Sequence, residues 1–524
     1  MKRPNVFPAV ALAVSTALAG CGSTTPGHAN DASPGNINDA SSSVSFRVWV
    51  TTPPHRLLDM VFMIDNSGMA PKVAKMIAQF PKLIAALKDT GDGTLPDLRI
   101  AIIDSDLGTG GAYSSGPCGP KTLPGGSLSL YGDLGRFQMP NATDCGVTSA
   151  NATYLEYTSG SPVNFKGDIN TVFACLAGGL GFQGCGEEHP LQAFEFALIA
   201  GGLGNGNDSQ HAMLRPNALL ALVFLTDEDD CSAAPNDGMF GEKPELRGES
   251  ASLRCGTRAH QCGGQNLASP PPGYPTTASF SAPFSTCAAR TDTCDFSKVD
   301  TSQPTPECSP LKDVTELAAE IKTLKDDPAN QIVVAGIFGW PLSEADMATA
   351  TYKIAPVPNP NTADTAHPTV FDLWPVCYDP THKPANGTDF NPDAAGWGAA
   401  PGLRLSAFVD EFGENGLKFS ICQSDLASTM SQIGAKLARQ MFNHCLPASF
   451  AQYKNCTAHY LVPNSSGGYT QQTEAVTSCD ASPTMPACCT LGPDAPPCAT
   501  GEFLVQGDSG SALPLGTLLE FSCQ

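Results

Sequence analysis

The segment LLDMVFMIDNSGM, residues 57–69, decides how the rest of the chain is interpreted. An apolar run ends at Asp65, and a hydroxyl residue, Ser67, follows two positions later. This pattern predicts a buried strand that carries a carboxylate and a hydroxyl to one edge of a sheet. Hard cations such as Mg²⁺ and Ca²⁺ bind oxygen ligands of this kind. The segment therefore indicates a metal site at the end of a strand.

Apolar runs and amphipathic segments alternate along the following 370 or so residues. Strands are predicted at 98–103, 218–226, 331–338 and 417–422, and helices at 73–87, 169–176, 191–200, 311–324, 405–412 and 426–441. Pro81 lies inside the first helix, which we expect to kink or restart there. The alternation predicts an α/β fold with a doubly wound, mainly parallel sheet covered on both faces.

Changes in composition divide the chain of 524 residues, which has 51 glycines and 45 prolines. We predict a signal peptide at 1–21, a flexible polar tether at 22–50 that ends in a short edge strand at 44–50, and the α/β domain at 51–442. Loop-rich insertions are expected at about 109–164, 233–309 and 342–400. Residues 443–524 are predicted to form a small, strand-rich, disulfide-rich domain.

The N-terminus has the features of an export signal. Lys2 and Arg3 precede an apolar stretch at 6–17 that is too short to span a bilayer. The following Leu-Ala-Gly-Cys, ending at Cys21, resembles the lipobox of bacterial lipoproteins. That resemblance implies a lipid anchor on Cys21 and, because no aspartate follows the cysteine, export to the outer membrane. The alternative is an ordinary cleaved secretion signal.

Cysteine content and charge limit the environment and the partners. Twenty cysteines predict an oxidising compartment, and lipidation of Cys21 would leave an odd number for pairing. Within the first insertion, Cys118 and Cys145 are expected to form a local disulfide. A net charge of −22 excludes nucleic acid and anionic membrane surfaces as electrostatic partners.

Acidic residues recur where the predicted elements meet. Asp227 follows the strand at 218–226, and Glu187 and Glu188 precede a helix. Because parallel strands end at one edge of the sheet, we expect Asp65 and Asp227 to lie close together on that edge, which we call the rim. Two carboxylates about 4 Å apart repel by roughly 4 kcal/mol at an effective dielectric of 20, which a divalent cation would relieve. The alternative is a rim satisfied by loop amides at helix N-termini.

These motifs together resemble the von Willebrand factor A domain over about residues 55–441. Its metal-ion-dependent adhesion site has the pattern Asp-x-Ser-x-Ser, then a threonine, then an aspartate. Asp65, Ser67 and the pair Thr226-Asp227 match parts of this pattern. Residues 64–68, 184–191 and 226–232 also look like a group of lipoproteins, mostly myxobacterial, that carry the domain.

The resemblance implies Mg²⁺ or Ca²⁺ ligands at Asp65, Ser67 and Asp227. Met69 replaces the second serine, and its thioether is too soft for either ion. Glu188, or failing it Glu187, is the nearest substitute for the missing threonine ligand of the loop at 184–190. An extra carboxylate would neutralise more of the metal charge and weaken attraction to an acidic partner.

Further acidic residues flank these predicted ligands. Asp229 is a possible additional ligand, although it is also a candidate, with Asp230, Asp104 and Asp106, for solvation or helix capping.

The predicted function is a non-enzymatic, surface-anchored binding or adhesion lipoprotein whose ligand is a protein or polysaccharide. A structural envelope scaffold without metal-dependent binding is the alternative, and an exported hydrolase is third. A protease-like pattern, Gly-Asp-Ser-Gly-Ser with Ser509, follows His459 and Asp480. His459 and Ser509 are only 50 residues apart, too close for the two barrels of a chymotrypsin-like enzyme.

Overall fold

The computed structural model describes residues 44–49, 57–88, 94–123, 125–199, 212–233, 240, 249–267, 273–275, 282–294, 308–342, 352–359, 365–382, 397–441, 457–463, 469–478, 487–491, 503–507 and 518–523. The predicted signal peptide, Cys21 and most of the tether lie outside these residues. Within the described residues, no helix has the length and apolar character needed to cross a membrane.

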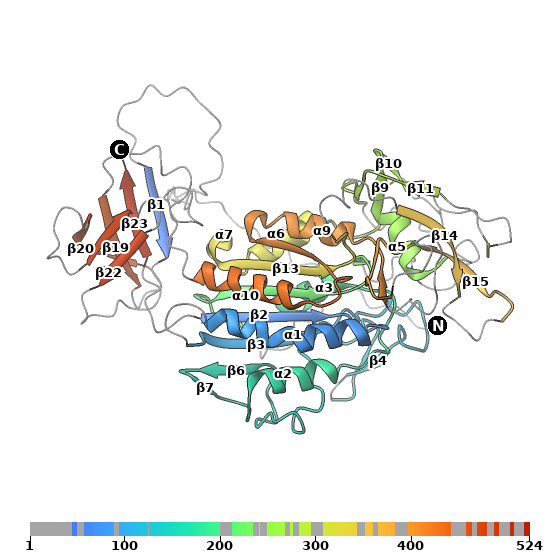
Figure 1. Ribbon diagram of the computed structural model, residues 1–524, viewed down its shortest axis with the longest axis horizontal. Coiled ribbons are helices and arrows are strands. Elements are labelled where there is room, and N and C mark those ends of the chain that lie inside the picture. The colour runs from blue at the N-terminus through green and yellow to red at the C-terminus, as the bar shows by residue number, and fades with distance from the viewer. Residues whose placement is uncertain are drawn as a thin grey trace, which may run out of the picture.

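A seven-stranded sheet runs through the middle of the molecule (Figure 1). Its order is β18-β13-β8-β2-β3-β6-β7. The strands are β2 (Leu57–Ile64), β3 (Asp97–Ile103), β6 (Leu155–Thr158), β7 (Ser161–Pro162), β8 (Leu219–Leu225), β13 (Ile332–Phe338) and β18 (Gly416–Ser420). Pairing is parallel from β18 to β3 and antiparallel at β6 and β7. The predicted doubly wound, mainly parallel sheet is confirmed.

Helices cover both faces of this sheet (Figure 1). One face carries α1 (Ala70–Lys88), α2 (Ile169–Gly178) and α10 (Ala427–Met441), and the other carries α3 (Pro190–Leu198), α6 (Val314–Lys322) and α9 (Leu403–Asp410). Alternate residues of β2 supply both cores. Phe62 packs with Phe80 of α1 and Phe173 of α2, while Met63 faces the opposite core. This two-sided burial explains why β2 is apolar at almost every position.

Helix α1 runs without interruption from Ala70 to Lys88, so the predicted restart at Pro81 is wrong. Pro81 is exposed on the solvent side of the helix. At this exposed position the helix continues although proline removes one backbone hydrogen bond.

The insertions build structure of their own. The first contributes β4 (Lys121–Thr122), β5 (Leu128–Ser129) and the edge strands β6 and β7. The later ones form α5 (Ala251–Ala259), β9 (His260–Cys262), β10 (Gln265–Asn266), β11 (Ala282–Phe284), β12 (Cys287–Ala289), β14 (Tyr352–Pro358), β15 (Thr369–Leu373), β16 (Cys377–Tyr378) and β17 (Gly398–Ala399). Strand β14 pairs with both β11 and β15, which joins the second insertion to the third. Figure 1 shows α5, β14 and β15 together at the end of the molecule toward which β2 and β8 run.

Six disulfides stabilise the described part of the chain. They are Cys118–Cys185, Cys145–Cys175, Cys231–Cys255, Cys262–Cys287, Cys294–Cys308 and Cys377–Cys422. The predicted Cys118–Cys145 bond is therefore wrong. Each of these two cysteines instead ties the first insertion to the segment that follows it, because the insertion folds back against α2 and the loop before α3.

A second sheet has the order β1-β23-β19-β20-β21-β22 (Figure 1). Its strands are β1 (Val44–Trp49), β19 (Thr457–Pro463), β20 (Tyr469–Ser478), β21 (Ala487–Leu491), β22 (Phe503–Gly507) and β23 (Leu518–Cys523). The predicted edge strand near residue 44 is confirmed, and it pairs with the final strand of the chain. Two short helical segments, α7 (Pro328–Gln331) and η4 (Gly413–Asn415), precede β13 and β18.

Candidate functional site

The order of the strands locates the site. Counted along the chain, the six main strands β2, β3, β6, β8, β13 and β18 lie in the order 3-2-1-4-5-6. The order reverses between β2 and β8, and open α/β sheets bind ligands at the carboxyl ends of the strands at such a switch point. Asp65 follows β2 and Asp227 follows β8, so both predicted acids lie at this point.

Asp65 is fixed by both strands. Its side chain is fully buried, and its backbone N–H donates to the carbonyl of Leu225 at 3.0 Å. One carboxylate oxygen accepts from the backbone N–H of Ser67 at 2.8 Å, and the other accepts from Oγ1 of Thr226 at 2.9 Å. Thr226 therefore orients the Asp65 carboxylate.

A third loop packs directly on the loop after β2. The N–H of Gly184 donates to the carbonyl of Asn66 at 2.9 Å. The N–H of Gly68 donates to the carbonyl of Phe182 at 3.3 Å. A Cβ atom on Gly184 would lie 1.9 Å from Oδ1 of Asn66, so only glycine permits this approach. The loop thereby brings Glu188 to the rim.

Glu188 lies beside the first two predicted ligands. Its carboxylate accepts hydrogen bonds from the hydroxyl groups of Ser105 and Ser67. Burial, and then the negative charges of Asp65 and Glu228, raise the pKa of Glu188 well above its usual value. Among the described residues, its second oxygen, Oε1, is buried without a hydrogen-bond partner.

The rim holds more negative charge than its hydrogen bonds satisfy. Burial, and then the charge of Asp227, raise the pKa of Asp65 to about 7. The same two causes, in the same order, raise the pKa of Glu228 well above its usual value. When ionised, the carboxylates of Asp65, Asp227 and Glu228 form, with the Ser67 hydroxyl, a donor set that contains only oxygen atoms. The Glu188 oxygen that lacks a hydrogen-bond partner provides a further acceptor. The residues therefore fit a hard divalent cation.

A lysine that the sequence analysis missed also reaches the rim. Lys72, in the first turn of α1, is 1% exposed and forms an ion pair with Asp227. Its ammonium also donates to the carbonyl of Gly398 at 2.5 Å. The available signal was a lysine in the first turn of a helix, where acidic residues are favoured.

Met69, at the position of the family's second serine, faces away from the rim. It is fully buried in the core formed by β2, α1 and α10. The thioether packs, and it supplies no ligand.

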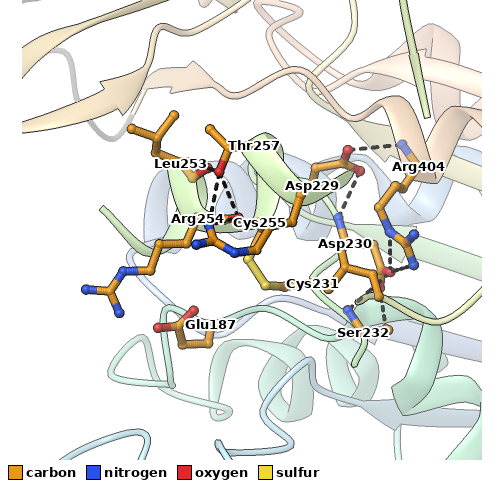
Figure 2. Close-up of a disulfide and its surroundings, with 12 residues drawn as sticks. Glu187, Asp229, Asp230, Cys231, Ser232, Leu253, Arg254, Cys255, Thr257 and Arg404 are labelled. Atoms are coloured by element: carbon orange, nitrogen blue, oxygen red, sulfur yellow. Dashed lines mark hydrogen bonds and ion pairs between the residues drawn. A yellow bond between two sulfur atoms is a disulfide. The ribbon is translucent and has the colours of Figure 1, made fainter. Parts of the chain in front are cut away.

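Glu187 lies against the Cys231–Cys255 disulfide (Figure 2), and its charge also acts on Glu228. One oxygen of Glu187 and the two sulfurs lie within 4.8 Å of one another. Both sulfurs are committed to the disulfide and have no thiolate to offer a metal. This cluster is therefore structural.

Asp229 and Asp230 are engaged in helix capping (Figure 2). Asp229 accepts from the backbone N–H groups of Arg404 and Leu405 at the start of α9, and it contacts His260 at 2.6 Å. Asp230 accepts from the N–H of Leu191 in α3 and pairs with the Arg404 guanidinium at 2.9 Å. Both carboxylates thus hold helices rather than turn toward Asp65.

Asp104 and Asp106 form a separate group after β3. Asp104 accepts from the side-chain amide of Asn66 at 3.2 Å, and Asp106 pairs with Lys121. Burial raises the pKa of Asp104 to about 6, and its carboxyl shares a hydrogen bond with Asp133. The group supports the loop next to Ser67.

The protease-like pattern lies largely outside the described residues. His459 lies on β19, whereas Asp480 and Ser509 lie outside the described residues.

No family model matches the sequence, and no curated protein matches it. Solved structures with a similar fold include a von Willebrand factor type A protein from Catenulispora acidiphila, at 10% identity over 92% of this chain and 60% of that one, with a TM-score of 0.24. The pilus adhesin SpaC from Lactobacillus rhamnosus GG matches at 7% identity over 93% of this chain and 45% of its own, with a TM-score of 0.28. An adhesive tip pilin from Group B Streptococcus agalactiae matches at 11% identity over 92% of this chain and 81% of its own, with a TM-score of 0.26.

This chain spans only 60% and 45% of the first two of these proteins. These likenesses carry no argument about the site, which rests on its own residues. The seven-stranded, mixed but mostly parallel sheet, with Asp65 and Asp227 at its switch point, is a doubly wound α/β fold.

Proposed function

We propose that the protein is a binding or adhesion module that holds a divalent cation at Asp65, Ser67, Glu188 and Asp227. The observation that carries the proposal is the buried Asp65 carboxylate, oriented by Thr226 and surrounded by further acids at the switch point. Buried carboxylates of this density require either protonation or a cation. Bound to the rim, the cation would present an open coordination position to a ligand group.

Mg²⁺ or Ca²⁺ suits this donor set because every ligand atom is oxygen. Ca²⁺ tolerates an irregular arrangement of carboxylates, whereas Mg²⁺ demands near-octahedral geometry. The presence of Glu188 in place of a neutral ligand favours a cation whose charge is largely neutralised. The partner would then be a protein or polysaccharide recognised through several weak polar contacts rather than one acidic group.

The proposed setting is the cell envelope. Six disulfides in the described residues are typical of an oxidising compartment. A lipid on Cys21 would attach the chain to the outer membrane, and residues 22–43 would separate the folded part from that membrane.

The second candidate is a structural envelope scaffold, and Lys72 is the observation that favours it. An ammonium group already neutralises Asp227 at the rim. If that neutralisation is permanent, the rim stabilises the fold and recruits nothing.

Calorimetric titration of the exported chain with Ca²⁺ and with Mg²⁺ separates the two candidates. We expect saturable binding of one ion, weakened at least about tenfold in Asp65→Ala. Asp410→Asn is the matched control, because Asp410 is an exposed acid on α9 outside the rim. Absence of divalent binding to the wild-type chain would leave the scaffold as the function.

A further inference from the structure

We propose that Lys72 is a built-in cation of the rim, which a divalent ion must displace from Asp227 before it binds. This inference rests on the proposed metal site and concerns its regulation. The ammonium and the metal compete for the same carboxylate oxygen. Without the divalent ion the rim is closed by the chain's own charge.

A buried ammonium at the position of Lys72 is unfavourable in free energy unless groups of the rim interact with it. The N-terminal turn of a helix carries a partial positive charge, which disfavours a lysine there. Burial at 1% exposure removes the water that would otherwise solvate the ammonium. Both costs are offset by the contact with Asp227 and the carbonyl of Gly398. The side chain is therefore bound at a specific place rather than extended into solvent.

The compensation is incomplete, and this leaves room for a divalent ion. Lys72 forms an ion pair with Asp227, whereas neither Asp65 nor Glu188 forms an ion pair among the described residues. One positive charge thus serves the three predicted carboxyl ligands, and Glu228 adds a fourth carboxyl group beside them. A divalent ion at the same place would bring twice the charge.

Displacement of Lys72 would also release a contact with the neighbouring segment 397–400. The carbonyl of Gly398, which accepts from Lys72, lies in β17. Two residues later, the N–H of Ala400 donates to the carbonyl of Asp227 at 2.8 Å. Residues 397–400 are therefore attached to the rim by two contacts, of which displacement of Lys72 would release one.

A matched pair of lysine variants tests the competition. Lys72→Met removes the ammonium and keeps the apolar stem. Lys75→Met is the control, because Lys75 lies one turn along α1 and pairs with Asp379 instead. In calorimetric titrations with Ca²⁺, we expect the affinity of Lys72→Met to exceed that of the wild type by about tenfold or more, and that of Lys75→Met to be unchanged.

Thermal unfolding supplies a readout that does not require binding by the wild-type chain. In EDTA, Lys72→Met is expected to melt at a lower temperature than the wild type, and excess Ca²⁺ is expected to restore it. Lys75→Met should lose stability equally with and without Ca²⁺. The double variant Lys72→Met/Asp227→Asn should recover part of the loss in EDTA, because the unpaired carboxylate is gone.

The outcomes for the inference and for the metal site are distinct. Equal Ca²⁺ affinity in the wild type and Lys72→Met overturns the competition but leaves the metal site intact. Binding by Lys72→Met alone supports the competition and shows that the native rim is locked against metal. If neither chain binds Ca²⁺, both the competition and the metal site are wrong.

Discussion

At the scale of single residues, the rim contains acids whose pKa values are raised by burial. The pKa of Asp65 rises from 3.8 to about 7, first through burial and then through the charge of Asp227. A raised carboxyl pKa stabilises the folded state below pH 3.8, and this contribution is lost as the pH rises through 7. Without a divalent ion, ionised Asp65 therefore destabilises the fold at neutral pH.

The variant Asp65→Asn tests whether ionisation of Asp65 destabilises the folded state. Asparagine can still accept from the N–H of Ser67 and bond to Thr226, but it carries no charge. In EDTA, the stability of the variant relative to the wild type should increase from pH 4 to pH 8 by up to roughly 4 kcal/mol. Chemical unfolding at several pH values measures this difference. A relative stability that falls as the pH rises would contradict the assignment of a raised pKa.

Some of these residues were predictable and some were not. Asp65 and Asp227 follow apolar runs, so their place at the ends of buried strands could be predicted from the order of residues alone. The contact of Lys72 with Asp227 joins positions 155 apart and depends on the angle at which α1 leaves the loop. No local pattern encodes that angle.

At the scale of secondary-structure elements, the acids after β8 hold two helices in place. Asp230 caps α3 through the N–H of Leu191 and pairs with Arg404 of α9. Both charged side chains of this pair are completely buried. A buried pair of this kind fixes how α3 and α9 sit on one face of the sheet, and thereby the start of both helices near the rim.

Removing one member of this pair should be more damaging than removing both. We expect Asp230→Ala to lose about 3–5 kcal/mol of unfolding free energy, because Arg404 would remain buried and uncompensated. The double variant with Arg404→Met should lose less than the sum of the single losses.

Chemical unfolding of the three variants gives this coupling energy. The control is Asp410→Asn, whose exposed pair with Lys418 is expected to contribute less than about 1 kcal/mol. Additive losses for Asp230 and Arg404 would show that the two helices are positioned independently.

The elements themselves were predictable to different degrees. The strands that became β2, β3, β8 and β13 are mainly buried apolar runs, and a parallel strand covered on both faces requires such a run. Strand β18 is a half-buried edge strand that was predicted from a shorter apolar run. Strand β6 was not predicted, because it is short, half-buried and set in a glycine-rich insertion. Its pairing with β3 across more than 50 residues is a tertiary contact that sequence periodicity does not show.

At the scale of the whole molecule, the insertions change what the switch point offers. The later insertions gather at the carboxyl end of the central sheet, where α5, β14 and β15 lie together, whereas the first insertion adds β6 and β7 beside β3 (Figure 1). The Cys377–Cys422 disulfide ties the third insertion to the loop after β18. The third insertion borders the rim, because the N–H of Ala400 donates to the carbonyl of Asp227 and the charge of Asp372 acts on Glu228.

The place of the insertions in the fold was not predictable from the sequence. Composition alone located the insertions but not the end of the sheet to which they fold. The Cys118–Cys145 prediction failed for the same reason, because pairing follows the folded path of the insertion and not proximity along the chain.

The most direct measurement is anomalous diffraction from crystals of the folded chain grown with Mn²⁺, an oxygen-binding ion with a measurable anomalous signal. We expect an anomalous peak within bonding distance of Asp65, Ser67, Glu188 and Asp227, with the Lys72 ammonium moved away from Asp227. Crystals of Asp65→Ala should lack that peak. A wild-type map with no peak at the rim, and with Lys72 still on Asp227, would show that the rim holds no divalent ion.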